Sequence, residues 1–247
     1  MVLGLFPRPF LICSRLYLYA WKIEWYRMSI KLLLLGICGF FWSLSYLEMI
    51  RIGIKEKTYA MPFVALSLNF TWEIYNSINA YLQFGPHLST IISCLWVLFD
   101  VGIVYTYFRY GARELSVSKF KFNLLSILFF GISLVFQHAM ILLAGPLLGA
   151  GYAGFLINLV MSLLFIRMFY RRPDLKGQNL FIALTKCIGT IAITILVGAV
   201  GIVRLGGNVP SIFVIGIVTF FIDVWYCILV NSRRLELKKT QQPNFQG

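Results

Sequence analysis

The sequence has few charged residues and lacks the usual motifs of soluble enzymes. Only 13% of its 247 residues are charged and 60% are hydrophobic, and the apolar residues form long runs that exclude a soluble core. No DDxxD cluster is present that would hold Mg²⁺ against a diphosphate, and there is no DxDD acid. GxSxG, HExxH and Walker motifs are missing, as is GxGxxG in a strand–helix context. Hydrolases, metalloproteases and nucleotide-binding enzymes therefore have no support.

Cysteine provides neither a disulfide framework nor a metal site. The five cysteines are odd in number, scattered, and mostly placed inside the apolar runs, at Cys13, Cys38, Cys94, Cys187 and Cys227. They form no CxxC pair and no cluster with histidine. We therefore expect no metal ligands and no cofactor.

The apolar runs predict seven transmembrane helices, because a spanning helix needs about 20 predominantly apolar residues. The expected spans are 31–50, 59–84, 88–108, 122–144, 146–168, 180–203 and 209–231. Gly85-Pro86-His87 and Gly145-Pro146 are turns too short to admit another domain. The predicted fold class is an all-α polytopic membrane protein, a seven-transmembrane-helix bundle over residues 31–231.

The two ends of the chain differ from the bundle in composition. Residues 1–30 place Trp21 and Trp25 among charges, which favours an interfacial helix at headgroup depth. Pro7, Pro9 and nearby charges break any apolar centre of a cleaved signal, so we expect this segment in the mature chain. Residues 232–247 are expected to form a polar C-terminal tail.

The net charge of +13 follows membrane topology and does not indicate a nucleic-acid partner. Most Lys and Arg residues lie beside the ends that follow spans one, three, five and seven, as do Arg51, Arg109, Arg113, Arg171, Arg172, Arg233 and Arg234. The positive-inside rule makes this face cytoplasmic, with the N-terminus outside. The basic residues before the first span oppose this orientation: Arg8, Arg15, Lys22, Arg27 and Lys31.

Three acidic residues, Glu73, Asp100 and Asp223, are expected near mid-membrane. An ionisable side chain there costs about 2.5–3.5 kcal/mol on insertion scales, so each needs a partner or a role. No Lys or Arg lies in the central part of a span, Lys186 being closer to an end, and desolvation then favours the neutral acid, which can donate a proton. We interpret Glu73 and Asp223 as catalytic acids that line one cavity. Asp100 remains open between a supporting and a direct role.

Polar and aromatic residues accompany these acids at helical spacing. Asn69, Glu73 and Asn76 stand at i, i+4 and i+7 and form one stripe. The supporting or substrate-binding candidates are Asp100, Asn69, Trp72, Asn76, Trp96, Tyr226 and Asn158. The alternative for Asn69, Asn158 and Ser162 is a structural role as interhelical hydrogen-bonding groups.

The second-span run MPFVALSLNFTWEIYNS resembles the signature of the small membrane-integral terpene cyclases of meroterpenoid and indole-diterpene biosynthesis. The runs LWVLFDVGIVYTYFRYG and FFIDVWY resemble that family's third-span and seventh-span segments, so the resemblance covers the bundle. In that family a second-span glutamate and a last-span aspartate are needed for activity, and by motif these are Glu73 and Asp223. The resemblance implies metal-independent, proton-initiated cyclisation of an epoxidised polyprenyl chain attached to an aromatic or other head group.

The main alternative is a small-solute or proton-coupled transporter in which the three acids form a relay and Asn69, Asn76 and Asn158 bind cargo. We find no repeated halves with paired Gly/Pro interruptions, which such transporters often show. A scaffold or receptor-like protein gives no reason for three central acids. The implied partners are a lipid-like epoxidised prenyl substrate and membrane lipid, in the endoplasmic reticulum membrane if the chain is eukaryotic or the cytoplasmic membrane if it is bacterial.

Overall fold

The computed structural model describes residues 9–241, and their side chains except those of residues 9–27, 84 and 241. Seven α-helices account for most of this part of the chain. They are α1 (Pro9–Glu56), α2 (Phe63–Phe84), α3 (Leu88–Glu114), α4 (Lys119–Ala144), α5 (Pro146–Arg171), α6 (Leu180–Thr194) and α7 (Pro210–Gln241). A π-helical turn, η1 (Ile195–Val200), continues α6, and a 3-10 turn, η2 (Val203–Leu205), follows it.

Six helices in the described part of the chain are long and apolar enough to cross a membrane. They include residues 28–56 of α1 and every later helix except α2, with η1 completing the α6 span. The α2 helix is 22 residues long, but its stripe of Asn69, Glu73 and Asn76 lowers its hydropathy. The protein is thus an integral multi-pass membrane protein, and the predicted all-α bundle is confirmed.

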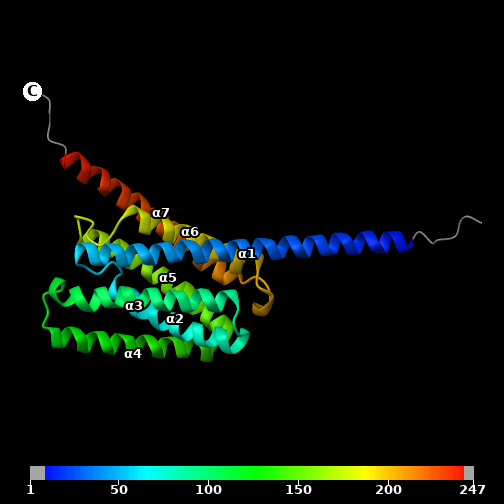
Figure 1. The fold of residues 1–247 in the computed structure, drawn as a ribbon, viewed down its shortest axis with the longest axis horizontal. Helices are drawn as coiled ribbons and strands as arrows, with labels where there is room; N and C mark the ends of the chain where they lie inside the picture. Colours follow the sequence, from blue (N-terminus) through cyan, green and yellow to red (C-terminus); the bar gives the residue numbers. More distant parts are fainter. Residues whose placement is uncertain (1–8, 242–247) are drawn as a thin grey trace, which may run out of the picture.

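The first and last helices extend beyond their predicted spans. The α1 helix runs from Pro9 through the expected boundary at residue 30 without a break, and α7 continues to Gln241. Figure 1 shows the blue N-terminal part of α1 projecting past the other helices. An interfacial position for residues 1–30 stays a prediction. Residues 1–8 and 242–247, and the side chains of Trp21 and Trp25, lie outside what is described.

The helices close a ring around the bundle interior. The α1 helix packs against α3 and α6, α2 against α3 and α5, and α7 against α5 and α6. The α4 helix packs on α2 and α5 from outside this ring and forms one edge of the bundle in Figure 1. Most of its outward side chains are apolar, and Leu128, Val135 and Leu142 are exposed, as expected for a surface that faces lipid. The buried polar residues of α4 are Ser126, Ser133 and Gln137.

Two sharp turns set the antiparallel order of neighbouring helices. Gly85 ends α2 at φ 64° and Gly145 ends α4 at φ 81°, a backbone region that glycine reaches without the penalty a Cβ would bring. Pro146 then opens α5 at a position where its missing N–H costs nothing.

The opposite end of the bundle is fastened by polar contacts. Arg172 donates to Glu114 at 2.7 Å and to the Tyr59 carbonyl at 2.9 Å, and its guanidinium lies 4.1 Å from the Tyr59 ring centroid. The Gly177 N–H donates to Glu56 at 2.7 Å. These contacts join the α1–α2 and α5–α6 connections to α3 at the end predicted to be cytoplasmic.

Candidate active site

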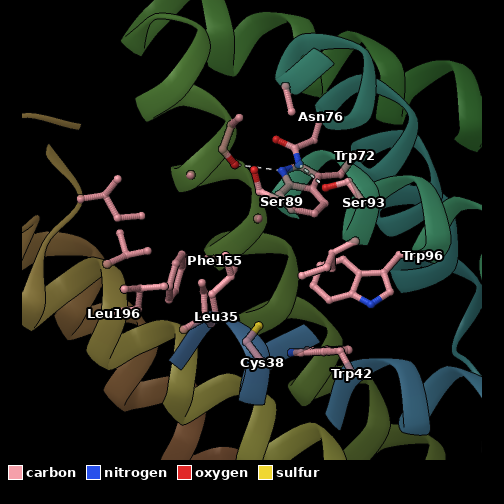
Figure 2. A pocket seen from close by; sticks show the side chains of 18 of the residues that line it. Leu35, Cys38, Trp42, Trp72, Asn76, Ser89, Ser93, Trp96, Phe155 and Leu196 are labelled. Carbon is pink, nitrogen blue, oxygen red and sulfur yellow. Dashed lines mark hydrogen bonds between the residues drawn. The ribbon is translucent and has the colours of Figure 1, made fainter. Parts of the chain in front are cut away.

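A cavity of about 750 Å³ lies inside the ring, between α1, α2, α3, α5 and the α6–η1 helix. This volume is typical of pockets that bury most of a small ligand. Figure 2 shows that each of these elements contributes to its wall. The labelled side chains are Leu35, Cys38, Trp42, Trp72, Asn76, Ser89, Ser93, Trp96, Phe155 and Leu196. Most of the residues that line the cavity are apolar.

Three tryptophans line the cavity, and two of them are fixed by their indole N–H groups. Trp72 donates to the Ala150 carbonyl at 2.8 Å, and Trp96 donates to Ser43 Oγ at 3.2 Å. Trp42 packs on Tyr46 with ring centroids 5.7 Å apart. The cavity therefore presents aromatic surfaces whose positions are set by the surrounding helices.

Glu73 is the acidic residue on the cavity wall. It is 1% exposed, and its Oε1 accepts a hydrogen bond of 3.0 Å from the Tyr46 hydroxyl. Its other oxygen, Oε2, has no hydrogen-bond partner among the described residues. One carboxyl oxygen is thus held by α1, while the second is buried without a described partner.

Asp100 belongs to the same network but does not line the cavity. Asn69 donates one amide hydrogen to Tyr46 Oη and the other to Asp100 Oδ2, each at 2.8 Å. The network therefore runs from Asp100 through Asn69 and Tyr46 to Glu73, across α3, α2 and α1. It brings two of the three predicted acids together.

The third acid, Asp223, is placed differently from the prediction. It is absent from the cavity lining, and its two carboxylate oxygens lie 2.6 and 2.9 Å from Lys186 Nζ. The expectation that Asp223 lacks a cationic partner is wrong, because the long Lys186 side chain reaches from α6 to α7 inside the bundle. The expectation that Glu73 and Asp223 line one cavity is not met either.

The other candidate residues divide between the cavity and the helix interfaces. Asn69, Trp72, Asn76, Trp96 and Asn158 line the cavity. Asn158 donates to Thr190 at 2.9 Å, which links α5 to α6, and its Oδ1 has no described partner. Tyr226 lies away from the cavity and donates to Gln178 Oε1 at 3.0 Å. Asn69 and Asn158 thus both face the cavity and join helices.

Similarity to known proteins identifies the family of the chain. A family model described as Pyr4-like transmembrane terpene cyclases matches residues 23–232, which span every residue of the cavity network. The chain belongs to the Pyr4-like transmembrane terpene cyclases. Membership in this family favours the cyclase interpretation over the transporter and scaffold alternatives.

Individual Pyr4-like relatives are similar at low identity. Terpene cyclase dpchB of Colletotrichum higginsianum is 26% identical over 64% of this chain and 65% of its own length. Terpene cyclase dpfgB of Gibberella zeae is 25% identical over 69% of both chains. Asnovolin H synthase nvfL of Aspergillus novofumigatus is 25% identical over 69% of this chain and 71% of its own. The chain thus spans 65% of the length of the first of these relatives.

The contacts of Tyr46 with Glu73 and of Lys186 with Asp223 are not predicted by the sequence. Tyr46 is one of four aromatic residues in the first apolar span. The backbone of Lys186 lies near a span end, whereas its ammonium group lies beside Asp223 in the bundle interior. A signal exists for Tyr46, because Trp42 and Tyr46 are four residues apart and share a helix face. Within the described residues, no three His, Cys, Asp or Glu side chains are grouped to hold a metal ion. Metal independence stays a prediction for the assay.

Proposed function

We propose that this protein cyclises an epoxidised polyprenyl chain, of meroterpenoid or indole-diterpene type, with Glu73 as the acid that protonates the epoxide. The observation that carries this proposal is the position of Glu73. It is the buried acid on an apolar, tryptophan-lined cavity, with one oxygen held by Tyr46 and the other without a described partner.

The hydrogen bonds of the network support a proton on Oε2 of Glu73. Tyr46 has a single O–H, which it donates to Oε1, and its oxygen in turn accepts from Asn69. In a carboxylic acid the carbonyl oxygen is the stronger acceptor, so acceptance at Oε1 favours a proton on Oε2, the oxygen without a described partner. Glu73 is therefore oriented to donate this proton to a substrate oxygen.

Proton transfer from Glu73 starts a sequence of bond changes that leaves the composition of the substrate unchanged. The epoxide oxygen takes the proton, its bond to the more substituted carbon breaks, and the π electrons of an internal alkene form the first carbon–carbon bond. Further alkenes extend the cation until a carbon loses a proton or a substrate hydroxyl adds. The proton released at the end balances the one that Glu73 supplied, so the product is an isomer of the substrate.

The walls of the cavity suit the cationic intermediates. A cation over an indole face gains about 2 kcal/mol or more when it is desolvated, and Trp72 and Trp96 are held in place by their N–H groups. Trp42 differs, because Lys186 Nζ already lies 5.6 Å from its ring centroid. We therefore assign cation stabilisation to Trp72 and Trp96.

Asn69 and Asp100 position Glu73 and do not relay protons to it. An amide N–H donates hydrogen bonds but does not pass its proton on, so the path from Asp100 to Tyr46 is interrupted at Asn69. Asp223 acts through its ion pair with Lys186, which packs behind Trp42. Lateral entry from the bilayer suits the lipid-like substrate, in the endoplasmic reticulum membrane if the chain is eukaryotic.

The proposal is tested by isomerisation. Membranes that contain the protein are incubated with an epoxy-prenylated phenol, and products of unchanged mass but new retention time are identified by chromatography and mass spectrometry. The alkene without the epoxide serves as the control substrate and is expected to remain unchanged. Recovery of only the starting epoxide, at verified membrane abundance, would exclude the proposed activity.

A further inference from the structure

The cavity is long and follows α1. Its lining on this helix extends from Met28 to Tyr46, and 18 helical residues at 1.5 Å each correspond to about 27 Å. Tyr46 is the residue that holds Glu73. A linear molecule with its reactive end at Glu73 therefore extends along α1 toward Met28.

The end of the cavity near Met28 is basic. Of the Lys and Arg residues whose side chains are described, Lys31 and Arg204 line the cavity, and His87 joins them. Three separate elements bring them there, because Lys31 belongs to α1, His87 precedes α3, and Arg204 lies in η2. The loop that carries Arg204 is folded back by an Ile202–Gly207 bridge. The other described basic residues, apart from the buried Lys186, lie near the opposite end of the bundle.

Polar groups continue from this basic end along the α2–α3 wall. His87 Nδ1 lies 3.0 Å from Ser89 Oγ, and Asn76 donates to Ser93 Oγ at 3.1 Å. Figure 2 shows Asn76, Ser89 and Ser93 grouped apart from the apolar side chains of Leu35 and Leu196. The cavity thus has an acid at one end, aromatic and aliphatic walls between, and a basic, hydroxyl-bearing end.

We propose that Lys31 and Arg204 bind an acidic oxygen of the substrate's head group, such as a carboxylate, phenolate or enolate, and so direct the terminal epoxide to Glu73. This inference rests on the proposed cyclase function. An anionic oxygen near two cationic side chains gains charge-assisted hydrogen bonds. A chain inserted the other way would put the acidic oxygen against Glu73, away from both cations.

The experiment compares two probes that share an epoxyfarnesyl chain on an aromatic head, one bearing a free carboxylic acid and the other its methyl ester. Lys31→Met is expected to raise KM for the acid about tenfold, the effect of losing one charge-assisted hydrogen bond, and to raise KM for the ester much less. Arg204→Gln should act in the same direction. Lys121→Met, which removes an exposed charge at the other end of the bundle, is the matched control.

The outcomes separate this inference from the function on which it rests. If the unaltered protein cyclises neither probe, the proposed function fails. If it cyclises both, and Lys31→Met and Arg204→Gln change KM for acid and ester equally or not at all, the head-group site is wrong. Assays in phosphatidylcholine vesicles with and without phosphatidylserine test whether an anionic lipid head group occupies this end instead. An effect of Lys31→Met that appears only with phosphatidylserine overturns the inference.

Discussion

Lys186 and Asp223 form an ion pair in the interior of the bundle, with Lys186 Nζ 2.6 and 2.9 Å from the two carboxylate oxygens. Lys186 is 0% exposed and Asp223 is 1% exposed, and the same ammonium group donates to Ser162 at 2.6 Å. Lys186 also lies over Trp42, a wall of the cavity. The pair joins α6, α7 and α5 directly behind the site.

We predict that Asp223→Asn and Lys186→Met each lower the thermal stability and the activity together. Removing one partner leaves a buried charge without compensation, which costs about 3–5 kcal/mol. The Asp223→Asn variant is therefore expected to lose thermal stability as well as a carboxylate. Thermal unfolding of the purified protein in detergent, measured beside product formation at matched abundance, checks this prediction.

The double variant Lys186→Met/Asp223→Asn is the control for these single changes. It removes both charges and is expected to recover most of the lost stability, since replacing a buried pair by neutral groups is often close to neutral. Recovered activity would support a positioning role. A stable but inactive double variant would mean that Asp223 or Lys186 takes part in the reaction itself, contrary to our assignment.

Glu73→Gln is predicted to abolish cyclisation while the protein stays folded. The change nearly preserves shape and removes the acidic proton, and a general acid contributes typically about 10²–10⁴-fold to the rate. Asp100→Asn should be milder, because Asp100 reaches the site only through Asn69. Product formation by both variants at equal membrane abundance is the measurement. Near-normal turnover by Glu73→Gln would remove the basis for the proposed mechanism.

Tyr46→Phe is predicted to lower kcat by up to about tenfold, because Glu73 loses the hydrogen bond that orients it and a hydrogen bond between neutral groups contributes about 0.5–1.5 kcal/mol. Tyr107→Phe is the matched control, since Tyr107 also makes a buried hydroxyl contact, at 3.0 Å from Ser126, but lies outside the cavity lining. Both variants should lose similar stability. An equal loss of kcat in the two would indicate a general structural effect.

The sequence predicts the apolar spans and the importance of Glu73 for the same physical reason. Long apolar runs and a lone acid within one are features of a single helix, so they are visible in a one-dimensional pattern. The hydrogen-bond partners of that acid are not visible in such a pattern. Tyr46 approaches Glu73 from 27 positions away, and only the packing of α1 on its neighbours determines this contact.

The contact of Lys186 with Asp223 is a second one that the sequence does not predict. Its backbone lies in the first half of α6, which suggests a position near the membrane surface. A lysine side chain has a flexible four-carbon stem, so its ammonium group can lie well away from its Cα. Here it reaches inward to Asp223, 37 positions away. The position of the Lys186 Cα along α6 therefore does not give the position of its ammonium charge.

Chelation is predicted to leave the activity unchanged. In the proposed mechanism the proton of Glu73 activates the epoxide oxygen, so no step requires a divalent cation. Turnover is measured after treatment with EDTA and dialysis, and again after Mg²⁺ is added. Activity that falls on chelation and returns with Mg²⁺ specifically would contradict initiation by a carboxylic acid alone.

Gly154 leaves room for the ring of Trp72, and replacing this glycine is predicted to change which product forms. A Cβ at residue 154 would lie 2.9 Å from Trp72 Cζ2 and 3.1 Å from Cε2, too close for both groups to keep their places. Because Trp72 is also tied to the Ala150 carbonyl, Gly154→Ala is expected to shift the indole within the cavity. Less room for the folded chain favours early loss of a proton, so the fraction of products with fewer rings should rise.

Gly131→Ala provides the comparison for this change. A Cβ at residue 131, on α4, meets no atom within 4 Å, so this variant adds the same methyl group without moving a cavity wall. The product ratio is determined by gas chromatography with mass spectrometry, at conversions low enough that secondary reactions do not contribute. We expect the ratio to change in Gly154→Ala alone. An unchanged ratio in Gly154→Ala, with Trp72 displaced in a structure of the variant, would show that this indole does not shape the folded substrate.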